Sequence, residues 1–151
     1  PELRETLARM SERGVSVFDI EVLRLAEETD VEIYAAAFES AAALGARRAC
    51  VNIDDGDRSR TIDRFGRLCD LAAPYGLGLD IEFMIWRPVA RIEDAVTVVR
   101  AAGRSNGHIL VDALHLDRSG GTPARPSAAV SPTPSAPWAV ASSCWRYSCS
   151  A

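Results

Sequence analysis

The sequence predicts an α/β fold built on a parallel sheet, and two observations lead to this prediction. Short apolar runs, typical of buried strands, alternate with longer segments that carry apolar residues at helical spacing. The cycle repeats about every 30 residues, which is the length of a strand–helix–strand unit. Because the strand-like runs are almost continuously apolar, both of their faces are expected to be covered. About four such units fit within residues 1–118 of the 151-residue chain.

A helix and a strand are predicted at the start of the chain. Residues 2–13 carry apolar side chains at helical spacing and are followed by Gly14, a residue typical of helix C-termini. Residues 15–25 then combine several apolar residues with acidic ones in the pattern of a strand. The first strand–helix unit therefore begins with residues 15–25.

The helix that follows is predicted from its N-terminal cap. Thr29 and Glu32 have the spacing of a capping box, in which each side chain binds a backbone N–H at the helix start. The apolar face of this helix stops near Gly45. Residues 49–53 are then expected to form a short buried strand.

Two further units complete the pattern. Apolar residues at helical spacing predict a helix over residues 62–72, which ends before Gly76. Residues 77–84 are the third predicted strand. Pro88 is expected to open the next helix, and residues 108–114 are the fourth predicted strand.

Two parallel-sheet architectures fit this pattern, a doubly wound open sheet and a TIM barrel. The positions of the polar side chains favour the TIM barrel. No dinucleotide-binding or P-loop glycine motif is present, and the glycine pair Gly76 and Gly78 precedes a strand instead of following one. Polar residues fall at or just after the ends of the predicted strands, the face on which barrels place their chemistry. These residues are Glu21, Asp54, Asp55, Glu82, Asp112 and His115. Since a complete barrel has eight units and about 250 residues, the sequence predicts a partial TIM (β/α)8 barrel.

The strand–helix pattern stops at Ser119. Residues 119–151 are rich in Ser, Ala and Pro, contain no acidic residue, and show neither helical nor strand periodicity. This composition predicts an irregular or disordered C-terminal tail. The tail also holds two of the three tryptophans and two of the four cysteines, and all 17 basic residues of the chain are arginines. An out-of-frame translation of a GC-rich gene is therefore an alternative interpretation of residues 119–151.

The third predicted strand carries the strongest candidate for chemistry. In residues 79–83 the carboxylates of Asp80 and Glu82 share one face of the strand, while the apolar side chains share the other. The apolar face is expected to pack on helices, which directs the two carboxylates into the barrel. A buried carboxylate without a partner is strongly disfavoured. Glu82 therefore needs a metal ion, a proton or an arginine, and a salt bridge within the barrel is the structural alternative.

The fourth predicted strand ends in a second candidate group. Asp112 closes an apolar run, and His115 is expected in the loop above it. Carboxylate oxygen and imidazole nitrogen suit Mg²⁺, Mn²⁺ or Zn²⁺ in mixed sites. On neighbouring parallel strands these side chains are expected to meet Glu82. His108 begins its strand, at the opposite end of the barrel, and is expected to be structural.

The acidic turn after residues 49–53 is a weaker candidate. Asp54, Asp55 and Asp57 are residue types that bind cations. Acidic residues and glycine directly after a strand are also typical of an exposed turn, and this interpretation is favoured here.

Five stretches together carry a family resemblance: residues 15–21, 43–47, 71–77, 80–86 and 111–120. Residues 14–120 resemble the sugar phosphate isomerase/epimerase family of xylose isomerase-like TIM barrels. The resemblance places the predicted strands as roughly the third to the sixth of the eight.

The resemblance implies a set of site residues. Glu82 and Asp112 would bind a divalent metal (Mn, Mg, Zn or Co), and Glu82 would also act as a catalytic acid or base. His115 would contact substrate and take part in catalysis, and Arg118 is a further candidate for substrate binding. Family members complete the metal site with a later His and a second Glu, which have no counterpart here because the pattern ends at Ser119.

The implied reaction is metal-dependent proton transfer next to the carbonyl of a sugar or sugar-like substrate. With one carboxylate of the pair present, little or no turnover is expected from this polypeptide alone. An alternative interpretation is a non-catalytic βα fragment that acts only by association, since four units leave two open strand edges. An abasic-site endonuclease of the same superfamily is a further alternative, although it would use a His-rich multi-metal site and the sequence contains two histidines.

Composition argues against several other classes of protein. A net charge of −4 disfavours a broad nucleic-acid surface. No apolar run approaches the ~20 residues of a membrane-spanning helix, and the first residues lack the apolar core of a secretory signal. The four cysteines form no disulfide framework, so a reducing cytoplasm is expected. The predicted partners are a small-molecule sugar and, through the open barrel edges, the chain itself.

Overall fold

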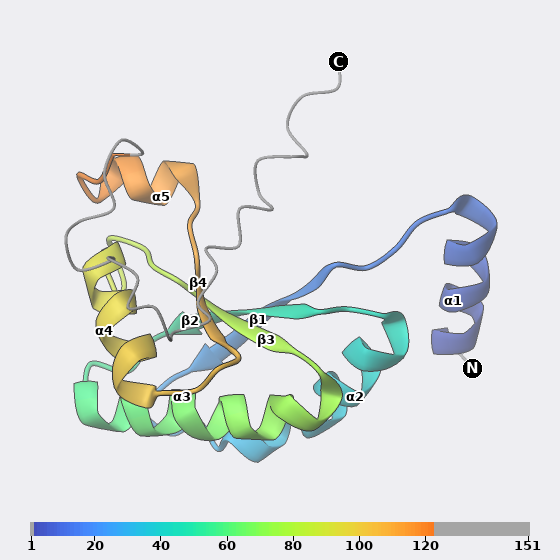
Figure 1. The fold of residues 1–151 in the computed structure, drawn as a ribbon, viewed down its shortest axis with the longest axis horizontal. Coiled ribbons are helices and arrows are strands. Elements are labelled where there is room, and N and C mark those ends of the chain that lie inside the picture. The colour runs from blue at the N-terminus through green and yellow to red at the C-terminus, as the bar shows by residue number, and fades with distance from the viewer. Residues whose placement is uncertain (1, 123–151) are drawn as a thin grey trace.

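The strands form one parallel sheet in the order in which they occur along the chain (Figure 1). The computed structural model describes residues 2–122, so residues 123–151 of the predicted tail lie outside the described part. The strands are β1 (Asp19–Leu25), β2 (Arg48–Ile53), β3 (Gly78–Glu82) and β4 (Gly107–Leu110). The helices are α1 (Glu2–Arg13), η1 (Val31–Tyr34), α2 (Ala35–Leu44), α3 (Arg58–Ala72), η2 (Ala73–Tyr75), α4 (Ile92–Ala102) and α5 (Ala113–Arg118), where η marks a short 3-10 helix.

The strand order distinguishes the two architectures that the sequence allowed. All three neighbouring pairs are parallel, and the order β1-β2-β3-β4 contains no reversal. Right-handed crossovers that advance in one direction leave their helices on one face of the sheet, and α2 and α3 lie along the same side in Figure 1. A doubly wound sheet instead reverses its order and covers both faces. The predicted α/β fold with four parallel strands is confirmed, and its form is that of a barrel wall.

The two faces of this sheet differ in chemistry. The face toward the helices is apolar, and its side chains belong to one core with residues of α2, α3 and α4: Ala49, Val51, Ile53, Leu79, Ile81, Phe83, Phe38, Phe65 and Val98. Burying each large apolar side chain of this kind stabilises the fold by roughly 1.5–3 kcal/mol. Because side chains alternate along a strand, the same strands turn Arg48, Cys50, Asn52, Asp80 and Glu82 to the opposite side. We call this opposite side the interior face.

The segment after β3 differs from its prediction. Pro88 does not open a helix, because residues 84–89 form a loop in which the Met84 N–H donates to the Val89 carbonyl over 3.1 Å. Helix α4 begins later, at Ile92. The Asp94 carboxylate accepts from the backbone N–H groups of Ala90 and Arg91 at 3.2 and 3.1 Å, which satisfies donors at the helix start.

The capping box predicted between Thr29 and Glu32 does not form. Asp30 takes the capping role, since its carboxylate accepts from the Glu32 N–H over 3.2 Å at the start of η1. Thr29 instead accepts from the Ala26 N–H over 2.9 Å and so closes the turn after β1. The C-terminal end of α2 at Gly45 agrees with the sequence, and Gly45 has the left-handed φ of 81° that favours glycine there.

The acidic turn after β2 is not the exposed turn that the sequence favoured. Asp55 is 4% exposed, and its carboxylate accepts from Arg60 at 2.6 and 2.7 Å and from Arg64 at 3.2 Å. Arg60 lowers the pKa of Asp55 chiefly through these hydrogen bonds. Asp57 caps α3 by accepting from the Arg60 N–H over 2.9 Å. This turn therefore anchors α3 to β2.

Helix α1 has the predicted bounds but no buried residue. It lies beside α2, apart from α4 and α5, at the end of a long connection (Figure 1). Within residues 2–122, no helix has both the length and the apolar character that crossing a membrane requires.

Candidate functional site

Glu82 lies at the C-terminal end of β3, on the interior face, as the strand pattern predicted. Its side chain is 17% exposed. One oxygen, Oε2, accepts from the Asn52 amide over 3.2 Å and from the Cys50 thiol over 3.7 Å, both on β2. Two donors from the neighbouring strand therefore fix the orientation of this carboxylate.

The other oxygen of Glu82 faces His115. Oε1 lies 3.8 Å from Nε2 of His115, whose side chain is 12% exposed. The ring of Trp86 stands nearly perpendicular to the imidazole, at 81° and with 5.2 Å between ring centroids. The Nδ1 atom of His115 is buried without a hydrogen-bond partner. The predicted meeting of Glu82 and His115 thus occurs, with an aromatic ring as a third member.

Within residues 2–122, the Asp112 side chain does not join Glu82 and His115 in the predicted three-residue cluster, and it binds the backbone of the next helix instead. It lies two residues beyond β4 and caps α5, because its Oδ1 accepts from the N–H groups of Leu114 at 2.8 Å and His115 at 3.0 Å. His115 was expected in a loop and lies instead in α5, since the Asp112 cap starts a helix there. Arg118, the other predicted substrate-binding residue, is exposed in the last turn of α5.

The salt bridge within the barrel is made by Asp80 instead of Glu82. Asp80 is buried, and both of its oxygens accept from the guanidinium of Arg48, with Nε to Oδ2 at 2.8 Å. The Arg48 side chain crosses Gly78, where a Cβ atom would lie 2.5 Å from Nη1 of Arg48. Because residue 78 has no side chain, the ion pair has room to form. Arg48 is therefore paired with Asp80 and not with Glu82.

His108 lies in the same layer as this ion pair. It pairs in register with Asp80, is 8% exposed, and its Nδ1 has no hydrogen-bond partner. Burial lowers the pKa of His108, and the positive charge of Arg48 acts in the same direction, while Asp80 opposes both. His108 is thus a buried residue beside a complete ion pair, as suits the structural role expected for it.

The loop that carries Trp86 is held by Asp54, the first residue after β2. Arg87 forms an ion pair with Asp54, which also lies 3.8 Å from the Arg24 guanidinium. Ile85 and Trp86, just before Arg87, are 48% and 58% exposed. The ion pair therefore fixes the loop that follows Glu82, and this loop exposes the two apolar side chains.

The residues present do not by themselves complete a metal site. Among residues 2–122, no three His, Cys, Asp or Glu side chains are grouped so that they would hold an ion. Glu82 and His115 offer two donors, and one oxygen of Asp112 is engaged in capping α5. Catalytic zinc sites use three protein ligands. The metal that the family resemblance implies would need ligands beyond these.

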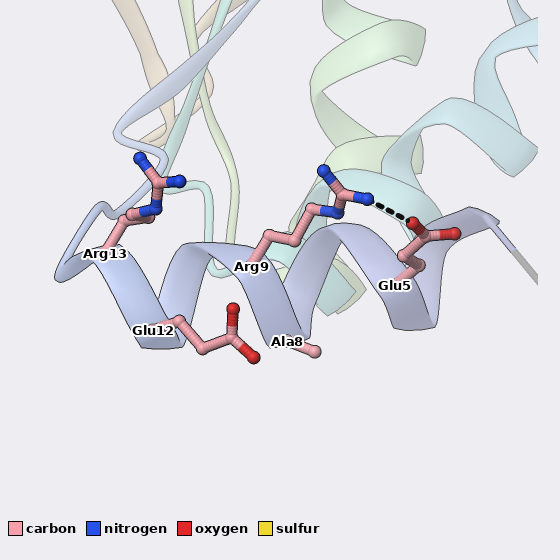
Figure 2. Close-up of a pocket in the computed structure, with 5 residues that line it drawn as sticks. All are labelled: Glu5, Ala8, Arg9, Glu12 and Arg13. Carbon is pink, nitrogen blue, oxygen red and sulfur yellow. Dashed lines mark hydrogen bonds and ion pairs between the residues drawn. The ribbon is translucent and has the colours of Figure 1, made fainter.

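One hollow of the surface lies far from this chemistry. It runs along α1 and is lined by Glu5, Ala8, Arg9, Glu12 and Arg13 (Figure 2). Arg9 and Glu5 form an exposed ion pair at 2.8 Å within it. Because all five side chains come from one helix with no buried residue, the hollow encloses no ligand and is not the candidate site.

Asn52, Cys50 and Trp86 are the members of the site that sequence reasoning missed. Asn52 carried a usable signal, since an amide in an otherwise apolar strand requires a buried partner. Trp86 was visible as an aromatic residue four positions after Glu82, but nothing in the sequence placed it against His115.

Comparisons with known proteins establish the fold. No protein-family model and no curated protein matches the sequence. The structure of the IolI protein with a bound zinc atom aligns at 18% identity and a TM-score of 0.66, covering 77% of this chain and 49% of IolI. The probable 3-DHS dehydratase AsbF from Bacillus anthracis aligns at 16% identity and 0.66, covering 80% and 48%. D-psicose 3-epimerase in the presence of D-fructose aligns at 14% identity and 0.62, covering 78% and 50%.

Other matching structures are described as xylose isomerase-like TIM barrels or xylose isomerase domain proteins. The predicted resemblance to these barrels is confirmed at the level of the fold, and the chain spans about half the length of the three proteins compared above. Identities of this size carry over the fold alone, since one fold hosts several chemistries.

Proposed function

We propose that this chain is the Glu82-bearing part of a sugar isomerase- or epimerase-like barrel and that Glu82 moves a proton next to a substrate carbonyl. One observation carries the proposal: Glu82 is anchored through Oε2 and leaves Oε1 facing His115. A general base must be held within reach of the proton that it removes, and the contacts from β2 supply that restraint. The name of one matching structure, an epimerase studied with D-fructose, supports the substrate class.

Each side chain has a proposed part in this step. Oε1 of Glu82 takes a proton from the carbon beside the carbonyl. His115 donates a hydrogen bond to the carbonyl or neighbouring hydroxyl oxygen, on which negative charge develops. Trp86 covers the imidazole and lines the substrate space, and Arg118 stays a prediction for an anionic group of the substrate.

In this proposal a divalent metal would bind only where further ligands complete the site. Asp112 and Glu82 remain the predicted ligands, and the zinc in the IolI structure supports metal use within this fold. Since no group of three donors forms within residues 2–122, no step is assigned to a metal here. We accordingly propose that turnover by this polypeptide alone is slow, although faster than the same reaction in buffer.

Association without catalysis is the second candidate function. In the described part of the chain, β1 and β4 each pair with one neighbour only. Phe18, just before β1, and Val22, within it, are 48% and 43% exposed. Open strand edges with apolar side chains promote pairing with another chain. The endonuclease alternative is weaker, because His108 is buried beside Arg48 and Asp80, and so His115 is the only histidine at Glu82.

Location in a reducing cytoplasm also remains a proposal, supported by the two free cysteines Cys50 and Cys69 within the described residues.

Hydrogen–deuterium exchange into D-fructose tests the main proposal. The full chain, with a manganese salt, is incubated with D-fructose in D2O, and NMR follows deuterium at the carbons next to the carbonyl. Exchange above the buffer rate is expected, with loss of roughly 100-fold or more in Glu82→Gln. The matched control is Glu39→Gln, an exposed glutamate on α2. Exchange that is absent in the native chain, or equal in both variants, contradicts the proposal.

A further inference from the structure

The position of His115 is not fixed by burial of its own helix. Helix α5 is six residues long and has no buried residue. The Nδ1 atom of His115 is buried without a hydrogen-bond partner, so no hydrogen bond at this atom orients the ring. The side chains packed against the imidazole therefore decide where Nε2 points.

Trp86 is the aromatic neighbour of this imidazole. The two rings meet edge to face, with 5.2 Å between their centroids, an arrangement that aromatic pairs favour. Trp86 is itself largely exposed, so burial does little to hold it in place. The interactions that hold the loop around Trp86 consequently also determine how the His115 ring is packed.

Backbone hydrogen bonds shape this loop. The Arg87 N–H donates to the Met84 carbonyl over 2.9 Å, which closes a turn around Trp86. The Met84 N–H donates to the carbonyl of Val89 over 3.1 Å, and Val89 is buried in the core. These contacts define the turn and attach the C-terminal end of the loop to the core.

The Arg87 side chain attaches the turn itself to the end of β2. It is 13% exposed and forms an ion pair with Asp54. The Asp54 N–H donates to the Leu25 carbonyl over 2.8 Å, so this carboxylate stands on a residue that is tied to β1. Burial lowers the pKa of Arg87, and the positive charge of Arg24 acts in the same direction. Because a largely buried guanidinium is strongly disfavoured without its carboxylate, the loop depends on Asp54.

We propose that Asp54 and Arg87 are positioning residues of the candidate site. Their ion pair holds Trp86 against His115, and this packing keeps the imidazole facing Oε1 of Glu82. The proposal rests on the proposed function of Glu82 and His115 and extends it to a pair that touches neither of them. Loss of the pair is expected to slow the chemical step more than it weakens substrate binding.

Arg24 offers a matched control for this ion pair. Its guanidinium lies 3.8 Å from the same Asp54 carboxylate, but the side chain is 61% exposed and belongs to β1. Arg24→Gln therefore removes a positive charge beside Asp54 and leaves the loop attached. Arg87→Gln removes the same charge together with the attachment, and Arg87→Lys keeps the charge.

The histidine signals provide a test that needs no catalysis. The sequence contains two histidines, His108 and His115, so the NMR spectrum of the full chain has two imidazole Cε1–H signals, which His115→Gln assigns. Spectra are recorded at pH 8, where an ordinary imidazole is neutral. The ring current of the indole shifts the His115 signal while the two rings are in contact, and Trp86→Leu gives its position without that contact.

The variants are expected to divide into two groups in these spectra. Arg87→Gln and Asp54→Asn should each move the His115 signal toward its position in Trp86→Leu and leave the His108 signal unchanged. Arg24→Gln should leave both signals unchanged, and Arg87→Lys should restore most of the native position.

Deuterium incorporation into D-fructose, under the conditions given above, is the second readout. Arg87→Gln is expected to lower kcat by roughly 10- to 100-fold, because a misplaced catalytic group costs this much, and to leave KM nearly unchanged. Asp54→Asn/Arg87→Gln should be no slower than the slower single variant, since the two residues act as one unit.

An unchanged His115 signal in Arg87→Gln, with a native His108 signal, overturns the positioning role and leaves the role of Glu82 intact. Equal shifts in Arg24→Gln and Arg87→Gln also overturn it, because charge alone would then explain them. If loss of the native His108 signal shows that Arg87→Gln does not fold, Asp54→Asn decides by the same criterion. A native chain without deuterium incorporation overturns the proposed function, and a shifted His115 signal then supports the packing role alone.

Discussion

Asn52 donates its side-chain amide to Oε2 of Glu82 over 3.2 Å, and this contact leaves Oε1 toward His115. Asn52 is 4% exposed, so bulk water offers its amide little alternative to Glu82. Cys50 adds a weaker contact to the same oxygen at 3.7 Å. The two oxygens of Glu82 are therefore not equivalent, since β2 holds one and the other is directed to the candidate site.

Replacing Asn52 by leucine is expected to destabilise the fold through Glu82. The substitution removes the stronger donor to Oε2, and an unsatisfied buried acceptor lowers the free energy of unfolding by about 1–3 kcal/mol. The same substitution in a Glu82→Met background is expected to cost much less, because both partners are then apolar. Urea denaturation of the four proteins measures the difference. Equal losses in the two backgrounds would show that Asn52 does not act through Glu82.

The ion pair of Arg48 and Asp80 gives a larger expected effect. Both side chains are largely buried, so Asp80→Leu leaves a guanidinium without its carboxylate and is expected to lower the free energy of unfolding by about 3–5 kcal/mol. The double variant Arg48→Met/Asp80→Leu removes both charges and is expected to recover most of this loss. Chemical denaturation with and without the second substitution checks it.

Gly78→Ala is expected to disturb the same ion pair, because the added Cβ would collide with the Arg48 guanidinium. If Asp80→Leu is as stable as the native chain, the interior face does not depend on this pair.

Most of the fold could be predicted from the sequence because it rests on local periodicity. The apolar alternation in residues 79–83 correctly assigned one face of β3 to the helices and Asp80 and Glu82 to the interior. The predicted start of α4 was wrong because proline is a common first residue of helices. The helix start is instead determined by the Asp94 carboxylate, which accepts from two upstream backbone N–H groups. These contacts form only when the loop before α4 has folded, so the sequence pattern did not reveal them.

The candidate site was predictable only in part, since its contacts join separate strands. Glu82 and His115 were placed together correctly, Glu82 from its position at a strand end and His115 from the segment that follows the neighbouring strand. The partner of Glu82 could not be chosen from spacing, because Arg48 and Asn52 both alternate onto the same face of β2. Register decides the choice: Arg48 reaches Asp80 past Gly78, and Asn52 reaches Glu82. Glu21 was predicted at the end of its strand and lies inside β1, at a bulge that no glycine marks.

His108 is expected to make stability depend on pH. Its folded pKa lies below the ordinary value of 6.5, chiefly because burial disfavours the imidazolium. In the unfolded chain the ring takes up a proton near pH 6.5, so the unfolded state binds more protons below that pH. The free energy of unfolding should fall as pH drops below 6.5, by at most about 1.4 kcal/mol per pH unit. The fall from His108 ends once the folded ring is itself protonated.

Denaturation of the native chain and His108→Leu between pH 7 and about pH 5 isolates this contribution, since most carboxylates titrate lower. The native chain should lose stability relative to the variant as pH falls. His115→Gln is the matched control for the second histidine. Parallel pH profiles for the native chain and His108→Leu would contradict the prediction.

The open edge of β1 predicts self-association of the chain. Val22 is 43% exposed at this edge, and β1 pairs only with β2 within the described residues. Edge strands with exposed apolar side chains favour pairing with another strand, whereas a charged residue opposes it. Val22→Lys is therefore expected to shift the chain toward monomer at a fixed concentration, measured by sedimentation equilibrium. Ile33→Lys, at a 66% exposed residue of η1, carries the same change of charge away from the edge and should leave the distribution unaltered. A native chain that stays monomeric over the whole concentration range would remove the basis for function by association.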